Sequence, residues 1–340
     1  MGIQLFSIKK TQYLWNKTMQ YLTYVWGSIH VPTHPQVFAI ESTNRCQLKC
    51  LMCPRSEMTR KIGDIEVDFF KLIIDRDCKY TAYLFLDEMG EPLLHPNILD
   101  LIEYAQKRGI KVYLTTNACA LNKEISENLL KLKLERLYIS FEGVNKEIYE
   151  RIRRNANFEQ VRVNIEYFCE LKRKGKYKKP FIQIDCIELR ETIPSFNHFR
   201  DYWKDKVDKV NLKSFRDWDG SIPSITELAP KIMPKPPLRE RCPLPWFSVV
   251  VLWDGKVVPC CYDFDAKYVL GNLREESLEE IWNNDKMTRL REAHVYGEID
   301  KIPLCKNCSM MGLFERRFAY LLSKFLIKGL EYLKKKRGRK

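Results

Sequence analysis

Short runs of β-branched and aromatic residues alternate with helical patterns along most of the chain, beginning at about residue 37. Such runs predict strands, and apolar residues that recur every three or four positions predict amphipathic helices between them. Between residues 97 and 109, for example, Ile98, Leu101 and Ile102 fall on one helix face and Gly109 supplies the stop. The predicted strands are VFAIE (37–41), YLFLD (83–87), KVYLTT (111–116), RLYISF (136–141), FIQIDCI (181–187) and KVNLKSF (209–215).

This alternation of strands and helices predicts an α/β fold with a parallel sheet. At roughly 30 residues for each strand–helix–strand unit, residues 37–221 hold about six units. A closed eight-stranded barrel takes about 250 residues, so the prediction is a partial, open (β/α)6 barrel of the TIM type. The opening leaves room for a large substrate at the C-terminal ends of the strands.

The pattern changes after residue 221, where crowded prolines predict a non-helical connection. Further on, FSVVVLWDGKVVPCCYD (247–263) predicts a β-hairpin that turns at Asp254 and Gly255, and ESLEEIWNN (276–284) predicts a short helix. The predicted domains are an N-terminal helical extension (1–36), the barrel (37–221), the proline-rich connection (222–241), a small hairpin and helix domain (242–312) and an amphipathic basic helix (313–340).

The C-terminal helix predicted at 313–340 places large apolar side chains on one face, with arginines and lysines interspersed. Such a helix could lie on an anionic membrane surface, or it could pack against the protein's own surface. The first thirty residues lack the uninterrupted apolar core of a signal peptide or a spanning helix. We therefore expect a cytoplasmic protein that could contact a membrane through this helix.

Composition narrows the class of protein and its partners. Hydrophobic residues make up 45% and charged residues 30% of the 340-residue chain, which is typical of a globular core. The net charge is +14, but six basic side chains fall within the last seven positions. Because the basic excess is partly a tail effect, nucleic acid is not an expected partner, although a nucleic-acid-binding protein stays open as an alternative class.

Twelve cysteines in a chain of this length without an export signal are typical of metal ligands and buried thiols, not of a disulfide framework. Four of them lie within strand or helix patterns and are predicted to be buried packing thiols: Cys78, Cys119, Cys169 and Cys186. The other eight fall into two groups.

The first group is the loop TNRCQLKCLMCPR (43–55), directly after the first predicted strand. Its spacing lets Cys46, Cys50 and Cys53 converge on one small object at the C-terminal face of the barrel. A cubane iron–sulfur cluster normally has four cysteine ligands, so three would leave one iron open to an external ligand. The alternatives are a zinc site completed by His30 or His34, or three incidental buried thiols.

This loop resembles the hallmark of the radical S-adenosylmethionine superfamily, and the resemblance extends over residues 37 to about 215. It implies that the amino and carboxylate groups of S-adenosylmethionine chelate the open iron of a [4Fe–4S] cluster held by the three cysteines. It also implies that Met52 lies near the adenine of that cofactor.

Two further segments resemble motifs of the same family. DEMGEPLLHP (87–96) resembles the Gly-Gly-Glu motif, with Met89 in the first glycine position. There Gly90 permits close backbone approach and Glu91 offers a carboxylate to the methionine ammonium. TTNA (115–118) resembles Thr-Asn-Gly and assigns Asn117 to the cofactor site, with Ala118 in place of the glycine.

SFEG (140–143), followed by YERIR (149–153), resembles the Ser-Ile-Asp-Gly segment and its downstream arginine. The resemblance implies that Ser140 hydrogen-bonds the cofactor and that Arg153 pairs with its carboxylate. Glu142 replaces the usual aspartate. These landmarks follow successive strands in chain order, as the family requires.

The second cysteine group comprises Cys242, Cys260, Cys261, Cys305 and Cys308. Its spacing alone fits a structural zinc ribbon as well as an iron–sulfur site. The order RCPLPW, DGKVVPCCYD, CKNC resembles the SPASM-type extension of some radical enzymes, which carries auxiliary [4Fe–4S] clusters. Five cysteines support one such cluster, with Cys242, Cys260, Cys305 and Cys308 as ligands and Cys261 able to substitute for Cys260.

The resemblance implies an enzyme that reductively cleaves S-adenosylmethionine to methionine and a 5′-deoxyadenosyl radical, which abstracts hydrogen from a substrate carbon. A low-potential donor such as flavodoxin or ferredoxin would supply the electron. An auxiliary cluster with a full ligand set favours a net oxidation or epimerisation of a sugar-like small molecule. Modification of a peptide or protein by the same chemistry is the alternative, and a non-catalytic metal-stabilised scaffold is the alternative of another class.

Oxidising an alcohol also requires a proton acceptor. The candidates on the C-terminal side of the barrel are Arg190, Asp217 and Asp219. Each could equally be a solvated loop charge or a salt-bridge partner.

Overall fold

The computed structural model describes residues 2–142, 145–218, 222–230 and 241–308. Asp219 and the C-terminal helix predicted at 313–340 lie outside these residues, so their roles stay predictions. Within the described part of the chain, no helix is both long enough and apolar enough to cross a membrane.

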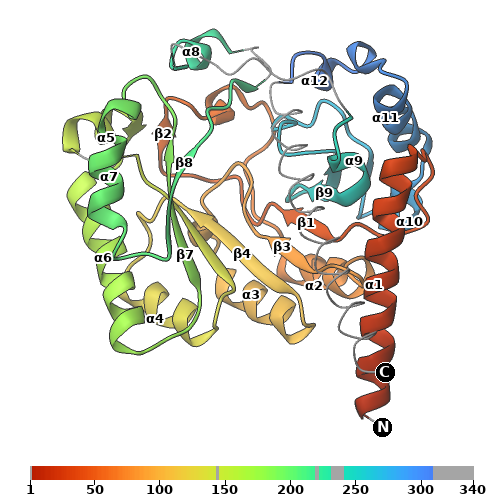
Figure 1. Ribbon diagram of the computed structural model, residues 1–340, viewed down its shortest axis with the longest axis horizontal. Coiled ribbons are helices and arrows are strands. Elements are labelled where there is room, and N and C mark those ends of the chain that lie inside the picture. The colour runs from red at the N-terminus through yellow and green to blue at the C-terminus, as the bar shows by residue number, and fades with distance from the viewer. Residues whose placement is uncertain (1, 143–144, 219–221, 231–240, 309–340) are drawn as a thin grey trace, which may run out of the picture.

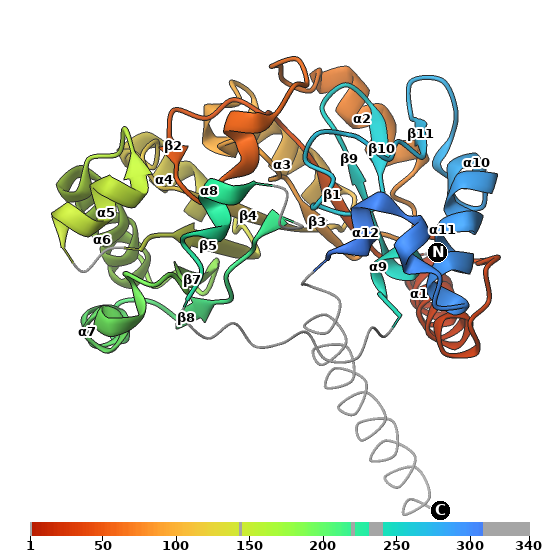
Figure 2. The same cartoon turned by 90° about the horizontal axis from the view of Figure 1, so that it is seen from above.

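Six parallel strands form the centre of the molecule, in the order β1-β3-β4-β5-β7-β8 (Figure 1). Helices that connect successive strands lie along the outside of the curved sheet (Figure 2). The predicted open (β/α)6 barrel is therefore confirmed. The strands are β1 (Val37–Ile40), β3 (Tyr83–Phe85), β4 (Lys111–Thr116), β5 (Arg136–Ser140), β7 (Phe181–Ile187) and β8 (Lys209–Lys213), and the helices are α2 (Val67–Arg76), α3 (Ile98–Lys107), α4 (Lys123–Lys131), α5 (Lys146–Ile152), α6 (Phe158–Lys174) and α7 (Phe196–Trp203).

Alternation along the strands gives the sheet two different faces. The outer face packs against the helices with side chains that are fully buried, among them Leu84, Leu114 and Ile139. The inner, concave face carries partly exposed residues such as Tyr113 and Tyr138 instead. The apolar core therefore lies between sheet and helices, and the inner face is left for chemistry.

The sheet does not end at β1. Strand β9 (Ser248–Val251) pairs with β1 in parallel, and β10 (Lys256–Val258) and β11 (Gly271–Asn272) extend the sheet to nine strands. The predicted hairpin is confirmed, and its turn contains Gly255 at φ +95°. Because one sheet runs through both parts, the small domain is fixed in register to the strand that leads into the cysteine loop.

Helix α1 (Gly2–Trp26) lies beside the helices of the small domain (Figure 1). The Tyr24 hydroxyl donates to the carbonyl of Arg241 at 2.8 Å, and the Trp246 Nε1–H donates to the carbonyl of Ser28 at 2.8 Å. The small domain contains α9 (Leu244–Phe247), α10 (Leu278–Trp282), α11 (Asp285–Val295) and α12 (Pro303–Lys306). Helix α10 falls within the predicted segment 276–284, and one helical turn, α8 (Pro223–Thr226), occupies part of the predicted non-helical connection.

We predict that Trp246→Ala destabilises the fold by about 3 to 5 kcal/mol, because the side chain is fully buried between α1 and the sheet. Denaturant unfolding under anaerobic conditions measures the change. Trp26→Ala is the matched control, because Trp26 is 69% exposed and its loss should leave stability nearly unchanged. Equal destabilisation by the two substitutions would contradict the packing described here.

Candidate active site

The cysteine loop leaves β1 and returns across the C-terminal edge of the barrel. Its short strand β2 (Lys49–Cys50) pairs antiparallel with β6 (Arg153–Arg154), which sets Cys50 opposite Arg153. The thiols of Cys46, Cys50 and Cys53 are all partly buried. Burial raises the pKa of Cys50 to about 12, and the charge of Arg153 opposes this only in part. A thiolate in this loop therefore needs further positive charge, which iron would supply.

The loop after β3 lies directly on the cysteine loop. A Cβ at Gly90 would lie 2.1 Å from the carbonyl oxygen of Thr43, so only glycine fits this approach. The main-chain N–H of Glu91 donates to the carbonyl of Arg45 at 2.7 Å. This contact holds Glu91 at the cysteine loop, where its charge acts on the pKa of Cys46.

Glu91 is 2% exposed and accepts hydrogen bonds from Leu93 N–H, the Thr116 hydroxyl at 2.7 Å and Asn117 N–H at 2.7 Å. Burial raises its pKa to about 7, although these hydrogen bonds act in the opposite direction. A carboxylate in this environment would be stabilised by a cation, and the ammonium group of S-adenosylmethionine is such a cation.

Asn117 contacts the cysteine loop from the end of β4. Its Nδ2 lies 3.7 Å from Cys46 Sγ, and its Oδ1 accepts from Gln47 Nε2 at 3.1 Å. The next residue, Ala118, has φ +60°, a left-handed conformation that explains why glycine suits this position. No pattern in the sequence indicates Gln47, which links the two loops.

Cys119 corrects one prediction. Cys78, Cys169 and Cys186 are buried, as predicted for packing thiols, but Cys119 is only partly buried. Its thiol hydrogen-bonds Gln47, and Cys46 and Glu91 influence its pKa, which burial raises to about 11. Cys119 differs from the other three because it lies beyond the end of β4, in the loop beside the candidate site.

Arg153 is held by Glu142. Its Nε and Nη2 donate to the two carboxylate oxygens, and its Nη1 lies 3.6 Å from Cys50 Sγ. Burial alone would lower the pKa of Arg153, but Glu142 and Cys50 raise it well above the usual value, so the guanidinium stays charged. Ser140 ends β5 at the same edge of the sheet. Contact of Arg153 or Ser140 with S-adenosylmethionine stays a prediction.

Met52 is buried in an apolar cluster above the barrel, and its carbonyl accepts from Trp218 Nε1 at 3.0 Å. The Trp218 ring lies 5.4 Å from that of Tyr262, which belongs to the small domain. Trp218 thus connects the cysteine loop to the small domain. No motif in the surrounding sequence indicates this contact. The cluster comprises Met52, Met89, Ile152, Leu189, Phe215, Ile222, Ile225 and Phe264.

The inner face of the sheet also carries a set of polar residues outside the sequence motifs. Asp185 accepts from Gln183 at 2.6 Å and from Asn211 at 2.9 Å. Lys213 is the second residue after Asn211 on β8, so the two side chains share this face. Asp87 lies two residues beyond Phe85, where β3 ends, and the charge of Lys213 acts on it.

Two members of this set have shifted pKa values. Burial raises the pKa of Asp87 to about 6, with hydrogen bonding by Thr115 and the charge of Lys213 acting in the opposite direction. Burial and the neighbouring Arg216 lower the pKa of Lys213. The Asp87 Oδ1 atom is buried and has no hydrogen-bond partner among the described residues. A signal for these residues was available, because each stands at the C-terminal end of a predicted strand on its inner face.

Two of the predicted proton acceptors are described. Arg190 is exposed in the loop after β7, where its main-chain N–H donates to the carbonyl of Leu228 at 3.3 Å. Asp217 is half-buried and directly precedes Trp218. Neither is part of the polar set on the inner face, and their catalytic role stays a prediction.

The C-terminal cysteines gather beside the barrel. Cys242 packs in one cluster with Cys305 and Cys308, and the Cys308 N–H donates to the Cys305 carbonyl at 3.2 Å. Cys260 experiences the charges of Cys242 and Cys305. Cys261, in contrast, accepts a hydrogen bond from Arg216 Nη1 at 3.6 Å. Cys261 also influences the pKa values of Cys242 and Cys260, so the choice between Cys260 and Cys261 as the fourth ligand stays a prediction.

His294 joins this group without a signal in the sequence. Its Nε2 lies 3.6 Å from Cys305 Sγ, and its Nδ1 faces the main-chain N–H of Cys242 at 3.5 Å. Burial lowers the pKa of His294 to about 4, so the ring is neutral at physiological pH.

The donors of both groups are thiols, which suit iron–sulfur clusters better than hard cations. Within the described residues, no three Cys, His, Asp or Glu side chains come close enough together to hold a single metal ion. A cubane binds each cysteine at a different iron, so its ligands stand farther apart than those of one ion.

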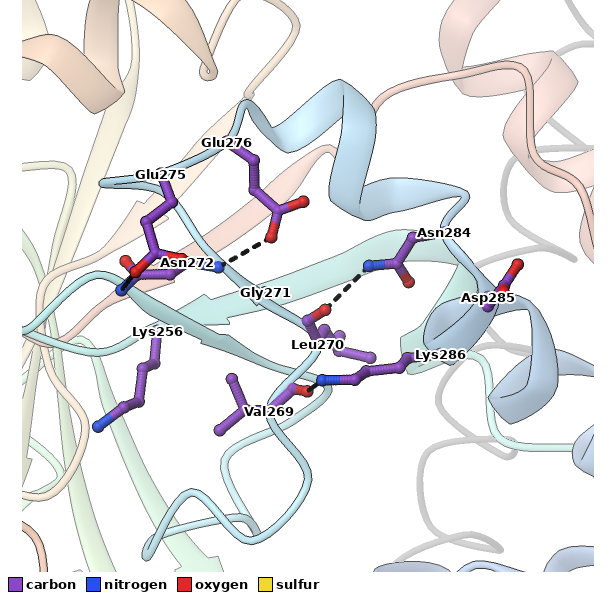
Figure 3. Close-up of a pocket in the computed structure, with 10 residues that line it drawn as sticks. All are labelled: Lys256, Val269, Leu270, Gly271, Asn272, Glu275, Glu276, Asn284, Asp285 and Lys286. Atoms are coloured by element: carbon purple, nitrogen blue, oxygen red, sulfur yellow. Dashed lines mark hydrogen bonds between the residues drawn. The ribbon is translucent and has the colours of Figure 1, made fainter.

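A separate pocket of about 660 Å³ lies on the small domain, between β10, β11 and the start of α11 (Figure 3). Two of its polar side chains donate to nearby carbonyls: Asn284 Nδ2 to that of Leu270 at 2.9 Å, and Lys286 Nζ to that of Val269 at 2.9 Å. None of the predicted site residues lines this pocket.

Comparison with known proteins supports the same two parts. Residues 40–179 match the radical SAM superfamily, and residues 242–309 match SPASM, an iron–sulfur cluster-binding domain. The AdoMet-dependent heme synthase of Methanosarcina barkeri is 31% identical over 75% of this chain and 84% of its own. The cofactor-modifying protein of the tungsten-containing aldehyde ferredoxin oxidoreductase of Pyrococcus furiosus is 25% identical over 80% of this chain and 86% of its own.

Two further similar proteins differ from each other in what their names say they act on or bind. The S-adenosyl-L-methionine-dependent 2-deoxy-scyllo-inosamine dehydrogenase of Niallia circulans is 24% identical over 83% of this chain and 96% of its own. The crystal structure of Streptococcus suis SuiB bound to precursor peptide SuiA has a TM-score of 0.59, with 16% identity over 82% of this chain and 70% of that one.

The matched families, the fold and the two cysteine groups all indicate the same class of enzyme. An enzyme of this kind uses S-adenosylmethionine, a [4Fe–4S] cluster that binds it and auxiliary iron–sulfur ligation in the C-terminal domain. The chain belongs to the radical S-adenosylmethionine superfamily and carries a SPASM domain.

Proposed function

We propose that this enzyme performs the net oxidation of an alcohol carbon in a sugar-like small molecule. The observation that carries this proposal is the Asp87 carboxylate, whose buried Oδ1 has no partner among the described residues. It stands three residues before Gly90, beside the predicted S-adenosylmethionine site. The related 2-deoxy-scyllo-inosamine dehydrogenase supports this class of substrate.

In this proposal Cys46, Cys50 and Cys53 would hold the N-terminal cluster. Met52, Gly90, Glu91, Asn117, Ser140 and Arg153 would surround S-adenosylmethionine, and Cys242, Cys260, Cys305 and Cys308 would hold one auxiliary cluster. When bound, the first cluster supplies the electron that splits S-adenosylmethionine into methionine and a radical that removes a substrate hydrogen atom, and the second accepts the electron left behind. A flavodoxin or ferredoxin is the proposed electron donor.

The chain's own residues have three tasks. Glu91 neutralises the methionine ammonium, since its carboxylate is buried at that position. Asp87 accepts the hydroxyl proton at Oδ1 when the alcohol carbon becomes a carbonyl. The apolar cluster around Met52 and Phe264 limits the access of water to the reacting carbon.

Hydrogen bonding on the inner face would position the substrate. Gln183 and Asn211 both donate to Asp185, which fixes the direction of all three side chains. Lys213 adds a donor on the same face, and burial lowers its pKa. Several donors and acceptors on one concave face suit a molecule with several hydroxyl groups better than an apolar one.

Peptide modification is the second candidate, because the fold of SuiB bound to its precursor peptide resembles this one. Incubating the reduced holoenzyme with S-adenosylmethionine and either polyols and aminocyclitols or candidate peptides separates the two. We expect enhanced 5′-deoxyadenosine formation and a carbonyl product with an alcohol. Enhancement by peptides alone would overturn the proposed substrate class.

We predict that Cys50→Ala abolishes 5′-deoxyadenosine formation and lowers iron from about eight to about four atoms per chain, since one of two cubanes loses a ligand. Iron and sulfide analysis after anaerobic reconstitution measures this. Cys169→Ala is the matched control, because Cys169 is a buried thiol of α6 and its variant should keep both clusters. Unchanged iron in the Cys50 variant would contradict the ligand assignment.

We predict that Asp87→Asn lowers product formation by about 100-fold or more while S-adenosylmethionine is still cleaved, because the amide cannot accept the proton. In the unsubstituted enzyme, oxidation should fall as the pH drops below about 6, where the raised pKa of Asp87 leaves the carboxyl protonated. The ratio of product to 5′-deoxyadenosine across pH measures both effects.

Asp75→Asn serves as the control for this substitution, because Asp75 pairs with Arg108 at the surface, outside the site. Its variant should keep the pH profile of the unsubstituted enzyme. If Asp87→Asn also kept both the product ratio and the pH profile, Asp87 would not be the proton acceptor.

A further inference from the structure

Arg153 lies between two partners that come from different strand ends. Its Nε and Nη2 donate to both carboxylate oxygens of Glu142, with 2.8 Å between Nη2 and Oε1. Its remaining nitrogen, Nη1, lies 3.6 Å from Cys50 Sγ. The Arg153 side chain is 7% exposed and that of Glu142 is not exposed at all. The guanidinium is therefore held away from water, with one edge on a carboxylate and the other on a sulfur.

The backbone fixes the same contact independently. Cys50 and Arg153 face each other in the β2–β6 pair, and the Leu51 N–H donates to the Ile152 carbonyl at 2.9 Å. The β2–β6 pairing sets the distance between the two strands, and Glu142 sets the direction of the Arg153 guanidinium. The backbone and the side chain therefore fix the contact between Arg153 and Cys50 independently. Such a doubly determined geometry is typical of a group that must keep its position.

A positive donor beside a cluster thiolate favours the more negative, reduced state of the cluster. A carboxylate close to that donor acts in the opposite direction, because its negative charge partly cancels the positive one. Inside a protein both effects are larger than at the surface, since little water screens them. Hydrogen bonds to the ligand sulfurs are also among the factors that set iron–sulfur potentials.

Resting on the proposed function of Cys50 as a cluster ligand, we infer that Arg153 and Glu142 form a positioning pair that sets the reduction potential of the N-terminal cluster. Arg153 raises this potential through the Cys50 sulfur, and Glu142 holds Arg153 in place and limits the rise. The pair thereby adjusts the reduction potential of the cluster to that of its electron donor, and this adjustment does not depend on bound substrate.

The test is a redox titration of the anaerobic holoenzyme, monitored by electron paramagnetic resonance. The N-terminal cluster is recognised by the change in its signal on adding S-adenosylmethionine. Glu142→Gln, which keeps the acceptor oxygen but removes the charge, should shift the midpoint potential upward. Arg153→Gln should shift it downward, and Arg153→Lys, which keeps the charge but loses the two-point pairing, should shift it less.

Arg151→Gln is the matched control. Arg151 belongs to α5, which leads into β6, and pairs at 2.5 Å with Glu191 while both side chains are well exposed. Its loss should leave the potential unchanged, because water screens this pair. The inference is overturned if Glu142→Gln and Arg153→Gln shift the potential in the same direction, or if neither shifts it while iron content is retained.

Failure of the proposed function gives a different result. If the unsubstituted holoenzyme showed no signal that responds to S-adenosylmethionine, or if Cys50→Ala kept that signal, the ligand assignment itself would fall. Opposite shifts in the two variants of the pair would instead support the inference whatever the substrate is, because the potential is measured without one.

Discussion

Six parallel strands end at one edge of the sheet, and the residues proposed to surround S-adenosylmethionine depend on this constraint. Glu91 follows β3, Asn117 directly follows β4, and Ser140 is the last residue of β5. Because these strands are parallel neighbours, the three residues lie at the same edge of the sheet. The cysteine loop then has to cross that edge, and the contact between Gly90 and the Thr43 carbonyl shows how closely it does so. The arrangement of these residues therefore depends on the common direction of the strands and on the missing Cβ of Gly90.

The edge also concentrates buried charge. Glu91, Glu142 and Arg153 are each less than a tenth exposed, an expensive arrangement for a chain that only had to fold. Glu142 and Arg153 compensate each other. Glu91 instead depends on hydrogen bonds from Thr116 and Asn117, and its raised pKa shows that they do not fully replace water. The buried Glu91 carboxylate would therefore be stabilised by a cationic ligand, as in the proposed function.

Continuity of the sheet relates the two cysteine groups. Because β9 pairs with β1, the hairpin that leads to Cys260 is an extension of the barrel and not a separate body on a linker. Trp218 spans the remaining distance from the other side, bonding Met52 and lying against Tyr262. The two cysteine groups thus belong to one continuous sheet, and Trp218 adds a second connection between the cysteine loop and the small domain.

The sequence by itself determined the six strands, the hairpin, the two cysteine groups and the order of the cofactor motifs, because periodicity and spacing are local properties. It could not determine which charges meet. The pairing of Glu142 with Arg153, the place of Cys119 beside Cys46, the approach of His294 to Cys305 and the effect of Lys213 on Asp87 join residues from different strand ends or helices. Only tertiary packing decided these contacts, because burial and the distance between charges, which set their strength, are properties of the folded chain.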